Sequence, residues 1–183
     1  RLCVTTDHFP RVDLTVALGS QDVPPIEMAG AFATIANGGQ KVTPTLIKQI
    51  RTVDGLIPLP AQSVACGKSC ESIGYNEMPA EQVVDARVAY VLGSMLRSVI
   101  EEGSGRRVGR EIPRKDLMGK TGTTNGPSEL WFTGFNRDVA TSVFIGFDQP
   151  QPMGESEQGA TVPVPIWIDY MKAVLEGTPE RML

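Results

Sequence analysis

Apolar residues recur along this chain at two different spacings, which divide it into helical and extended segments. Three segments, residues 22–37, 81–101 and 165–176, are predicted to be helices, and the apolar residues of the second have the three- and four-residue spacing of an amphipathic helix. The apolar positions of the second segment are Val84, Val88, Val91, Leu92, Met95 and Val99. Those of the third are Ile166, Trp167, Tyr170, Val174 and Leu175. We expect these side chains to be the ones that each helix packs against its neighbours.

Capping and turn residues indicate where the helices begin and end. Asp22 is positioned to cap the first helix, with two prolines in the turn that follows. Asn37-Gly38-Gly39 is typical of a helix end, because glycine tolerates the left-handed conformation required there. Gly103-Ser104-Gly105 is expected to end the second helix, and Gly177 the third.

Extended segments are predicted where β-branched and aromatic residues are bounded by turn signals. Residues 45–53 end at an Asp-Gly hairpin turn, whereas residues 58–80 are expected to be mostly loop. Three further strands are predicted at 116–124, 129–136 and 139–147. Because short links join these three, neighbouring strands should be antiparallel. The predicted fold class is therefore α+β, with an antiparallel sheet flanked by helices.

Composition limits the classes of protein to which the chain can belong. At 183 residues it is long enough for one domain with a core. The net charge of −4 provides no electrostatic footprint for nucleic acid, and no apolar run approaches the length of a membrane span. The chain opens with Arg1 rather than Met and carries no signal peptide. We therefore expect a piece of a longer protein, with any targeting segment or anchor upstream.

Lys120-Thr121-Gly122-Thr123, in a predicted strand, is the stretch most directly tied to chemistry. A Lys-Thr-Gly triplet on a strand is one of three motifs that build the active site of penicillin-recognising serine acyl-transferases. The rival interpretation is a phosphate-binding loop, which would require glycine at position 114, where Arg114 stands. No helix pattern follows the triplet, since Asn125-Gly126-Pro127 is a turn signal. Both observations exclude the nucleotide-binding interpretation.

The three cysteines allow more than one interpretation. Cys66 and Cys70 form a close pair in a predicted loop, and Cys3 is remote from both. A zinc site would need about four ligands, and the only histidine, His8, is distant in sequence. A disulfide in an oxidising compartment and a pair of free thiols both remain open at this point. The sequence indicates neither a metal nor a cofactor.

The order of several short segments carries a family resemblance. In chain order they are Ala17-Leu18-Gly19-Ser20, Glu27-Met28-Ala29, Ala36-Asn37-Gly38-Gly39, Gly103-Ser104-Gly105, the stretch 119–125, Trp131-Phe132 with Gly134, and the strand 143–148. This order resembles the class A penicillin-binding proteins, whose corresponding segments include ALGS, EMA, ANGG, GTG, KTGTTN and WFxG. The Val64-Ala65-Cys66 segment and the final helix resemble the 1A type.

The resemblance implies that residues 1–183 are the C-terminal portion of a D,D-transpeptidase domain. Such a domain cross-links peptidoglycan stem peptides through an acyl-serine intermediate and is acylated by β-lactam antibiotics, so both are implied partners. The full family protein also carries an upstream glycosyltransferase domain and membrane anchor, which implies the periplasmic face of the inner membrane. That oxidising compartment would favour a disulfide between Cys66 and Cys70.

The family also implies a role for each residue of the Lys-Thr-Gly-Thr strand. Lys120 would point its ammonium into the cleft and join the hydrogen-bond network of the catalytic serine. Thr121 and Thr123 would offer hydroxyls to the substrate carboxylate, and the Thr123 N–H would form half of the oxyanion hole. Gly122, which has no side chain, would let the substrate approach the backbone.

The chain departs from the family pattern in one respect. No serine is followed by Lys three residues on or by Asn two residues on, so the S-x-x-K and S-x-N motifs are both missing. The nearest approach, Ser94 with Arg97, fails because arginine cannot shed its proton to act as a base. We expect both motifs to precede Arg1 and the chain alone to be inactive. The alternatives are a non-catalytic penicillin-sensing or scaffolding domain and a β-lactamase-related acyl-serine hydrolase.

Overall fold

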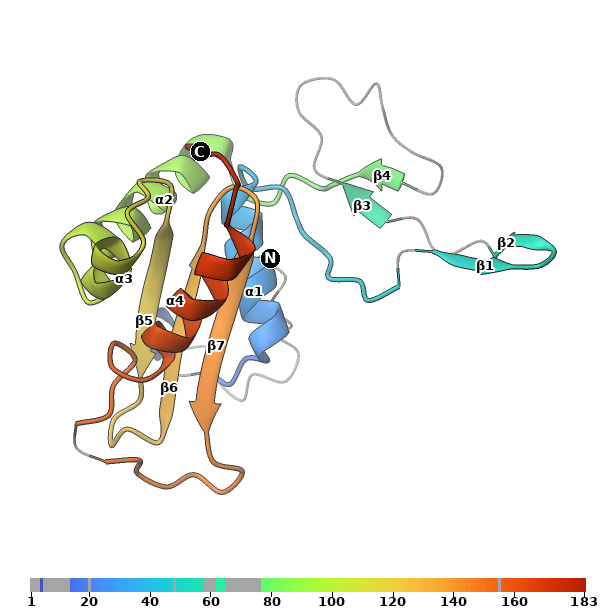
Figure 1. The fold of residues 1–183 in the computed structure, drawn as a ribbon. Coiled ribbons are helices and arrows are strands. Elements are labelled where there is room, and N and C mark those ends of the chain that lie inside the picture. Colours follow the sequence, from blue (N-terminus) through green and yellow to red (C-terminus); the bar gives the residue numbers. More distant parts are fainter. Residues whose placement is uncertain are drawn as a thin grey trace.

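The fold is built on a three-stranded antiparallel sheet (Figure 1). The computed structural model describes residues 4, 14–19, 21–47, 49–57, 62–64, 77–154 and 156–183. The sheet consists of β5 (Met118–Thr123), β6 (Glu129–Phe135) and β7 (Ala140–Gly146), in the order β5-β6-β7. The other elements are η1 (Leu14–Leu18), α1 (Pro25–Ala36), β1 (Ile50–Thr52), β2 (Gly55–Ile57), β3 (Gln62–Val64), β4 (Glu77–Pro79), α2 (Ala86–Glu101), α3 (Arg106–Glu111) and α4 (Pro163–Val174). The predicted α+β class is confirmed.

The three strands predicted from the sequence are confirmed, and each lies within two residues of its expected bounds. Both strand pairs are antiparallel, as the short links between them indicated. The turn between β6 and β7 is held by Asn136, which is fully buried. Its side-chain oxygen accepts hydrogen bonds from the backbone N–H groups of Asp138 (3.0 Å) and Val139 (2.8 Å). A local side-chain bond of this kind is the usual reason for asparagine in a turn.

Helices cover both faces of the sheet (Figure 1). On one face α4 contacts β6 and β7, and its buried side chains pack with Leu117 and Phe132. On the other face α1 contacts β6 and β7, and Ile35 packs with Met118 and Phe135. Because successive side chains of a strand point to opposite faces, the neighbours Leu117 and Met118 belong to different clusters. The sheet is therefore the middle layer of three.

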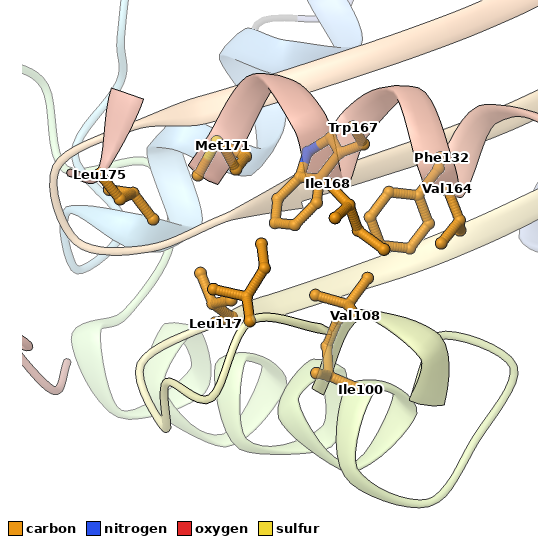
Figure 2. Packing of buried hydrophobic residues seen from close by; sticks show 10 residues of the cluster. Ile100, Val108, Leu117, Phe132, Val164, Trp167, Ile168, Met171 and Leu175 are labelled. Carbon is orange, nitrogen blue, oxygen red and sulfur yellow. The ribbon is translucent and has the colours of Figure 1, made fainter. Parts of the chain in front are cut away.

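Figure 2 shows the larger cluster, in which α4 faces the α2–α3 region and the start of β5. Trp167 is fully buried at its centre and meets the ring of Phe132 edge to face, with centroids 5.1 Å apart. Its Nε1–H donates to the Thr141 carbonyl at 3.2 Å. A Cβ on Gly134 would stand 2.7 Å from the Trp167 ring. The strand therefore needs glycine at this position for the indole to pack against it.

The packing face of α4 differs from the one predicted. Trp167 and Leu175 are buried as expected. The predicted positions Ile166, Tyr170 and Val174 are exposed, and Val164, Ile168 and Met171 are buried instead. Apolar residues surround most of this helix, so their spacing alone could not select the buried face. The tertiary contacts with β6, β7 and α3 select it.

The helix α2 begins at Ala86, five residues later than predicted. The intervening backbone is already bonded to the segment after α1: the Lys41 N–H donates to the Glu81 carbonyl (2.8 Å), and the Val83 N–H to the Gly39 carbonyl (3.0 Å). These bonds remove the partners that another helical turn would require. Asp85 then caps the helix, since its side chain accepts from the Arg87 N–H at 2.9 Å.

The predicted apolar face of α2 is confirmed only in part: Leu92 packs against the buried cluster of Leu96, but three other predicted positions are exposed. Val88, Val91 and Met95 are 56%, 57% and 63% exposed. The buried positions are Ala89, Gly93, Leu96 and Ile100. A Cβ on Gly93 would stand 2.8 Å from Leu183 Cδ1, so the C-terminal tail approaches the helix backbone closely. Hydrophobic spacing gives weight to large residues, whereas two of the four buried positions of this helix, Ala89 and Gly93, are small.

The N-terminal half also differs from the prediction in several details. The first helix starts at Pro25 with Pro24 as its cap residue and no side-chain cap bond, so the predicted Asp22 cap is wrong. Its predicted end is confirmed: Asn37 is the C-cap, and Gly38 has a φ of 79°. Among the described residues of the segment 45–53, Ile50–Thr52 forms a strand, which pairs with β2 through the predicted hairpin. The segment 58–80 was expected to be loop, yet β3 and β4 pair there in parallel.

A buried ion pair joins the segment before β5 to the C-terminal tail. The Arg114 guanidinium binds both carboxylate oxygens of Asp116, at 2.9 and 2.8 Å. Asp116 is fully buried and also accepts from the Arg181 N–H at 3.1 Å. Burial by itself would raise the pKa of Asp116, but the bonds from Arg114 and Arg181 outweigh it and lower that pKa. Arg114 also donates to the carbonyl of Thr178 at 2.8 Å.

The structure does not describe the cysteine pair or the histidine discussed above. The proposed pairing of Cys66 with Cys70 lies outside the described residues, as does His8. Among the residues that are described, no helix combines the length and apolar character needed to cross a bilayer.

Candidate functional site

The Lys-Thr-Gly-Thr stretch forms the second half of β5, which is an edge strand of the described sheet. Lys120 and Thr123 are exposed, and Thr121 and Gly122 are half-buried, whereas Met118 and Gly119 at the start of the strand are buried. The first part of the strand thus lies in the core, and the motif in its second part lies at the surface. The clusters at its buried end hold it in place.

Alternation along β5 separates the motif side chains onto two faces. Lys120 shares the face of Met118, which packs towards α1 and α2, and lies in register with Thr133 and Ser142. The hydroxyls of Thr133 and Ser142 are 2.8 Å apart, so a polar pair continues across the sheet from the lysine. The Lys120 ammonium donates to the Thr121 carbonyl at 2.9 Å and is otherwise exposed.

Thr121 and Thr123 share the opposite face, and each hydroxyl meets a different loop. Thr121 Oγ1 lies 2.6 Å from the hydroxyl of Ser104, which belongs to the link between α2 and α3. Thr123 Oγ1 accepts a hydrogen bond from the backbone N–H of Gly159 at 3.0 Å. Two loops that are distant in sequence therefore hold the two threonine side chains.

Gly159 lies against the backbone of β5 and β6. It is buried, and a Cβ there would stand 2.5 Å from the Gly122 carbonyl oxygen and 2.7 Å from that of Trp131. Because backbone atoms cannot move aside easily, only glycine fits this position without displacing the loop. This close fit brings the Gly159 N–H within reach of Thr123.

Gly122 has a packing role in addition to the one implied by the family. A Cβ on Gly122 would stand 3.0 Å from the Cβ of its cross-strand neighbour Trp131. The Trp131 ring in turn contacts Phe144 on β7, with ring centroids 4.6 Å apart. The absence of a side chain at Gly122 thus leaves room for this aromatic pair beside Lys120.

Thr124, the residue after the strand, stabilises the turn between β5 and β6 and does not contact the motif side chains through the bonds described here. Its hydroxyl accepts hydrogen bonds from the N–H groups of Ser128 (3.3 Å) and Glu129 (3.1 Å). Gly126 occupies the left-handed region with a φ of 68°. The Asn-Gly-Pro turn predicted from the sequence is therefore built around Thr124.

Two residues at the site were not among the predicted site residues. Ser104 was expected to lie in the turn that ends the second helix, within the segment that resembles the family's GTG, and no role was predicted for Gly159. Their contacts with Thr121 and Thr123 span 17 and 36 residues of sequence. The glycines around Ser104 signalled a turn, but no local pattern indicated which strand the turn would meet.

An open depression of about 550 Å³ lies elsewhere, between α3 and α4, and none of its lining residues belongs to β5. Its charged lining groups largely neutralise one another: the Lys172 ammonium is 3.4 Å from Glu111, which Arg107 contacts at 2.6 Å. The bond from Arg107 lowers the pKa of Glu111. No three His, Cys, Asp or Glu side chains gather as a metal site in the part of the chain that the structure describes.

An antiparallel sheet between helical layers, with Lys-Thr-Gly-Thr on its edge strand, defines the class of penicillin-recognising acyl-transferase domains. The family model of the penicillin binding protein transpeptidase domain matches residues 12–171. The chain therefore belongs to this family, and the resemblance found in the sequence is confirmed.

Known relatives agree with this assignment. The chain is 39% identical to penicillin-binding protein 1A of Pseudomonas aeruginosa, over 94% of this chain and 25% of that protein. The crystal structure of penicillin-binding protein 1A from Haemophilus influenzae superposes with a TM-score of 0.86 at 30% identity, covering all of this chain and 30% of the other. PonA1 of Mycobacterium tuberculosis, solved in complex with penicillin V, shares the fold (TM-score 0.73, 19% identity), covering 96% of this chain and 44% of that one. The chain thus spans about a quarter of the length of its curated relative.

Proposed function

We propose that this chain is part of a peptidoglycan D,D-transpeptidase that cross-links stem peptides through an acyl-serine intermediate and is acylated by β-lactams. The observation that carries the proposal is the Lys120–Thr123 stretch, exposed or half-buried on an edge strand, within a chain that belongs to the transpeptidase family. An open strand edge also suits a peptide substrate, which can add to it as a further strand.

In this proposal the two faces of β5 have different tasks. Lys120 contributes a positive charge beside the catalytic serine, where it stabilises the developing charge of acylation. Thr121 and Thr123 bind the substrate carboxylate through their hydroxyls, and the Thr123 N–H supplies half of the oxyanion hole. Gly122 lets the substrate approach the strand backbone. The separation of the lysine from the threonines on β5 supports this division.

The nucleophile is proposed to lie outside these residues. Acyl transfer needs an activated serine, and no serine here stands in an S-x-x-K or S-x-N motif. We therefore assign residues 1–183 to the C-terminal portion of the domain, with both motifs in the upstream remainder of the same protein. A membrane anchor there would hold the enzyme at the periplasmic face of the inner membrane.

Labelling of the full-length protein with a fluorescent penicillin tests the proposal. We expect one label per molecule, attached to the serine of an upstream S-x-x-K, and slow release of the acyl group. Labelling followed by rapid hydrolysis would indicate a β-lactamase-related hydrolase. Stable labelling without cross-linking of stem peptides would indicate a penicillin-sensing domain. No labelling at all would overturn the assignment.

The periplasmic location also bears on the cysteine pair. If Cys66 and Cys70 face an oxidising compartment, they should form a disulfide, because closing such a short loop costs little chain entropy. Alkylation of the purified protein without reductant should leave both thiols unmodified. Complete alkylation of both would contradict the prediction.

A further inference from the structure

We infer that Ser104 is a positioning residue for the carboxylate-binding threonines: its hydroxyl orients that of Thr121 so that the Thr121 proton points to the ligand. Ser104 would act through Thr121, so its role depends on the function proposed above. The ligand group is a carboxylate, either the terminal carboxylate of a stem peptide or the acid group of a β-lactam.

The contact itself is short and specific. Ser104 Oγ and Thr121 Oγ1 are 2.6 Å apart, at the close end of the range for hydroxyl–hydroxyl hydrogen bonds. Ser104 is exposed and Thr121 half-buried, so the pair lies where a ligand can reach it. An exposed serine loses rotational freedom when it holds this geometry, and the surrounding loop must supply the restraint.

The link between α2 and α3 supplies that restraint. The N–H groups of Gly103 and Gly105 both donate to the Val99 carbonyl, at 3.1 and 3.0 Å. A Cβ on Gly103 would stand 2.9 Å from Val99 Cα, and one on Gly105 would stand 3.2 Å from the Val99 oxygen. Ser104 is therefore the one residue of this Gly-Ser-Gly turn with a side chain, and the close fit of its neighbours fixes the turn against the end of α2.

The chemistry of the two threonines explains why such a contact is useful. A carboxylate only accepts hydrogen bonds, so a hydroxyl that binds it must donate. At Thr123 the direction is determined, because the Gly159 N–H can only donate and the Thr123 oxygen accepts. The Thr123 proton is then available for the ligand. Ser104 does the same for Thr121 when it donates to Thr121 Oγ1, and the donated bond also strengthens the next one in the chain.

The two contacts together form a matched pair. Thr121 and Thr123 are two residues apart on β5 and share one face. Each hydroxyl is hydrogen-bonded to a loop that close packing holds against its support. With Ser104 as the donor in its pair, as proposed, two protons are presented side by side. This arrangement suits the two oxygens of one carboxylate. Of the two contacts, only the one from Ser104 uses a side chain, so a conservative substitution can test it; the contact from Gly159 uses a backbone N–H.

The experiment compares acylation of the full-length protein by benzylpenicillin and by its methyl ester, in which the carboxylate is masked. Ser104→Ala should slow acylation by benzylpenicillin about fivefold to tenfold, as expected when the Thr121 hydroxyl is no longer oriented and its one hydrogen bond to the charged ligand is weakened or lost. It should leave acylation by the ester unchanged. Ser104→Thr, which keeps the hydroxyl, should restore the rate. Ser98→Ala, which replaces an exposed serine in the last turn of α2, is the matched control and should have no effect.

A double substitution shows whether Ser104 acts through Thr121. In a Thr121→Val background, Ser104→Ala should cause no further loss, because the partner hydroxyl is already gone. Equal rates for Ser104→Ala and the unsubstituted protein, equal losses with acid and ester, or fully additive losses would each overturn the role of Ser104. Failure of the unsubstituted protein to be acylated would instead overturn the proposed function, and the role of Ser104 with it.

Discussion

At the residue scale, neighbouring positions of β5 have separate surroundings. Lys120 lies on the face shared with Thr133 and Ser142, whereas Thr121 contacts Ser104 across the other face. An alternating strand can therefore bring a cation and a pair of hydroxyls to one edge without placing them in contact. This is the feature that allows each residue to be tested separately.

Replacement of Lys120 tests the charge on its own. Lys120→Ala should slow β-lactam acylation of the full-length protein by on the order of 10²-fold, as expected for losing a preorganised electrostatic group. Folding should hardly change, since an exposed side chain contributes little to stability. Stopped-flow measurement of the acylation rate provides the comparison.

Lys115→Ala is the matched control for this experiment. Lys115 is also exposed and lies just before β5, and its hydrogen bond to the Glu180 carboxylate uses the backbone N–H rather than the side chain. We expect its rate to equal that of the unsubstituted protein. An unchanged rate for Lys120→Ala would mean that the motif match is accidental.

At the scale of elements, α2 provides a direct comparison of two faces of one helix. Leu96 is buried against the sheet, and its neighbour Met95 is 63% exposed. Leu96→Ala should lower the free energy of unfolding of the chain by about 2–4 kcal/mol because it leaves a cavity. Met95→Ala should lower it by less than about 0.5 kcal/mol.

Urea unfolding followed by tryptophan fluorescence measures both variants, because Trp131 and Trp167 both lie in the folded region of sheet and α4. If Met95→Ala destabilises the protein as much as Leu96→Ala does, Met95 must be buried, as hydrophobic spacing predicted, and the buried face described here is wrong.

The ion pair before β5 predicts a pH dependence of stability. The pKa of Asp116 is lowered in the folded state relative to its ordinary value of 3.8. The stabilisation of the folded state by ionised Asp116 is therefore present above that value and is lost as the pH falls through the lower folded pKa. Asp116→Asn leaves the Arg114 charge without its partner and should cost about 3 kcal/mol at pH 7.

The difference in the free energy of unfolding between Asp116→Asn and the unsubstituted protein should then shrink as the pH falls below about 4. The reason is that protonation of Asp116 removes the same charge from the unsubstituted protein. Asp138→Asn is the control: it breaks a more exposed pair with Arg181, at 3.5 Å, and should cost less than about 1 kcal/mol. If Asp116→Asn lowers the free energy of unfolding by the same amount at pH 7 and at strongly acidic pH, this account is contradicted.

At the scale of the whole molecule, the site consists of one strand and two supporting loops. The chain holds the strand with Lys120, Thr121, Gly122 and Thr123, but no serine in either of the other two family motifs. A substrate could be held by these residues without being attacked by them.

The 183-residue chain by itself should therefore form no covalent adduct with a β-lactam. Intact-mass spectrometry after incubation with benzylpenicillin should show the unmodified mass, whereas the full-length protein under the same conditions should gain one acyl group. A stoichiometric adduct on any serine of this chain would contradict the missing-nucleophile argument.

Local features were predictable from the sequence for a clear physical reason. The three strands of the sheet, their antiparallel pairing and the end of α1 depend on residues that are close together in the chain. Gly38 at a helix end is an example, because a positive φ is a property of one residue. The position of the Lys-Thr-Gly-Thr stretch on a strand belongs to the same class.

What only the tertiary structure decided depends on residues that are far apart. The buried face of α2 depends on the close approach of Leu183 and Met118 to the helix at Gly93, where a Cβ would not fit, and its late start depends on bonds to the segment after α1. Likewise, the loops that support Thr121 and Thr123 come from positions 17 and 36 residues away. The sequence by itself therefore determined the family, the three strands of the β5-β6-β7 sheet and the motif. The fold determined which faces are buried and which groups hold the motif side chains, because packing depends on close approach of distant backbone segments, and local periodicity does not record that approach.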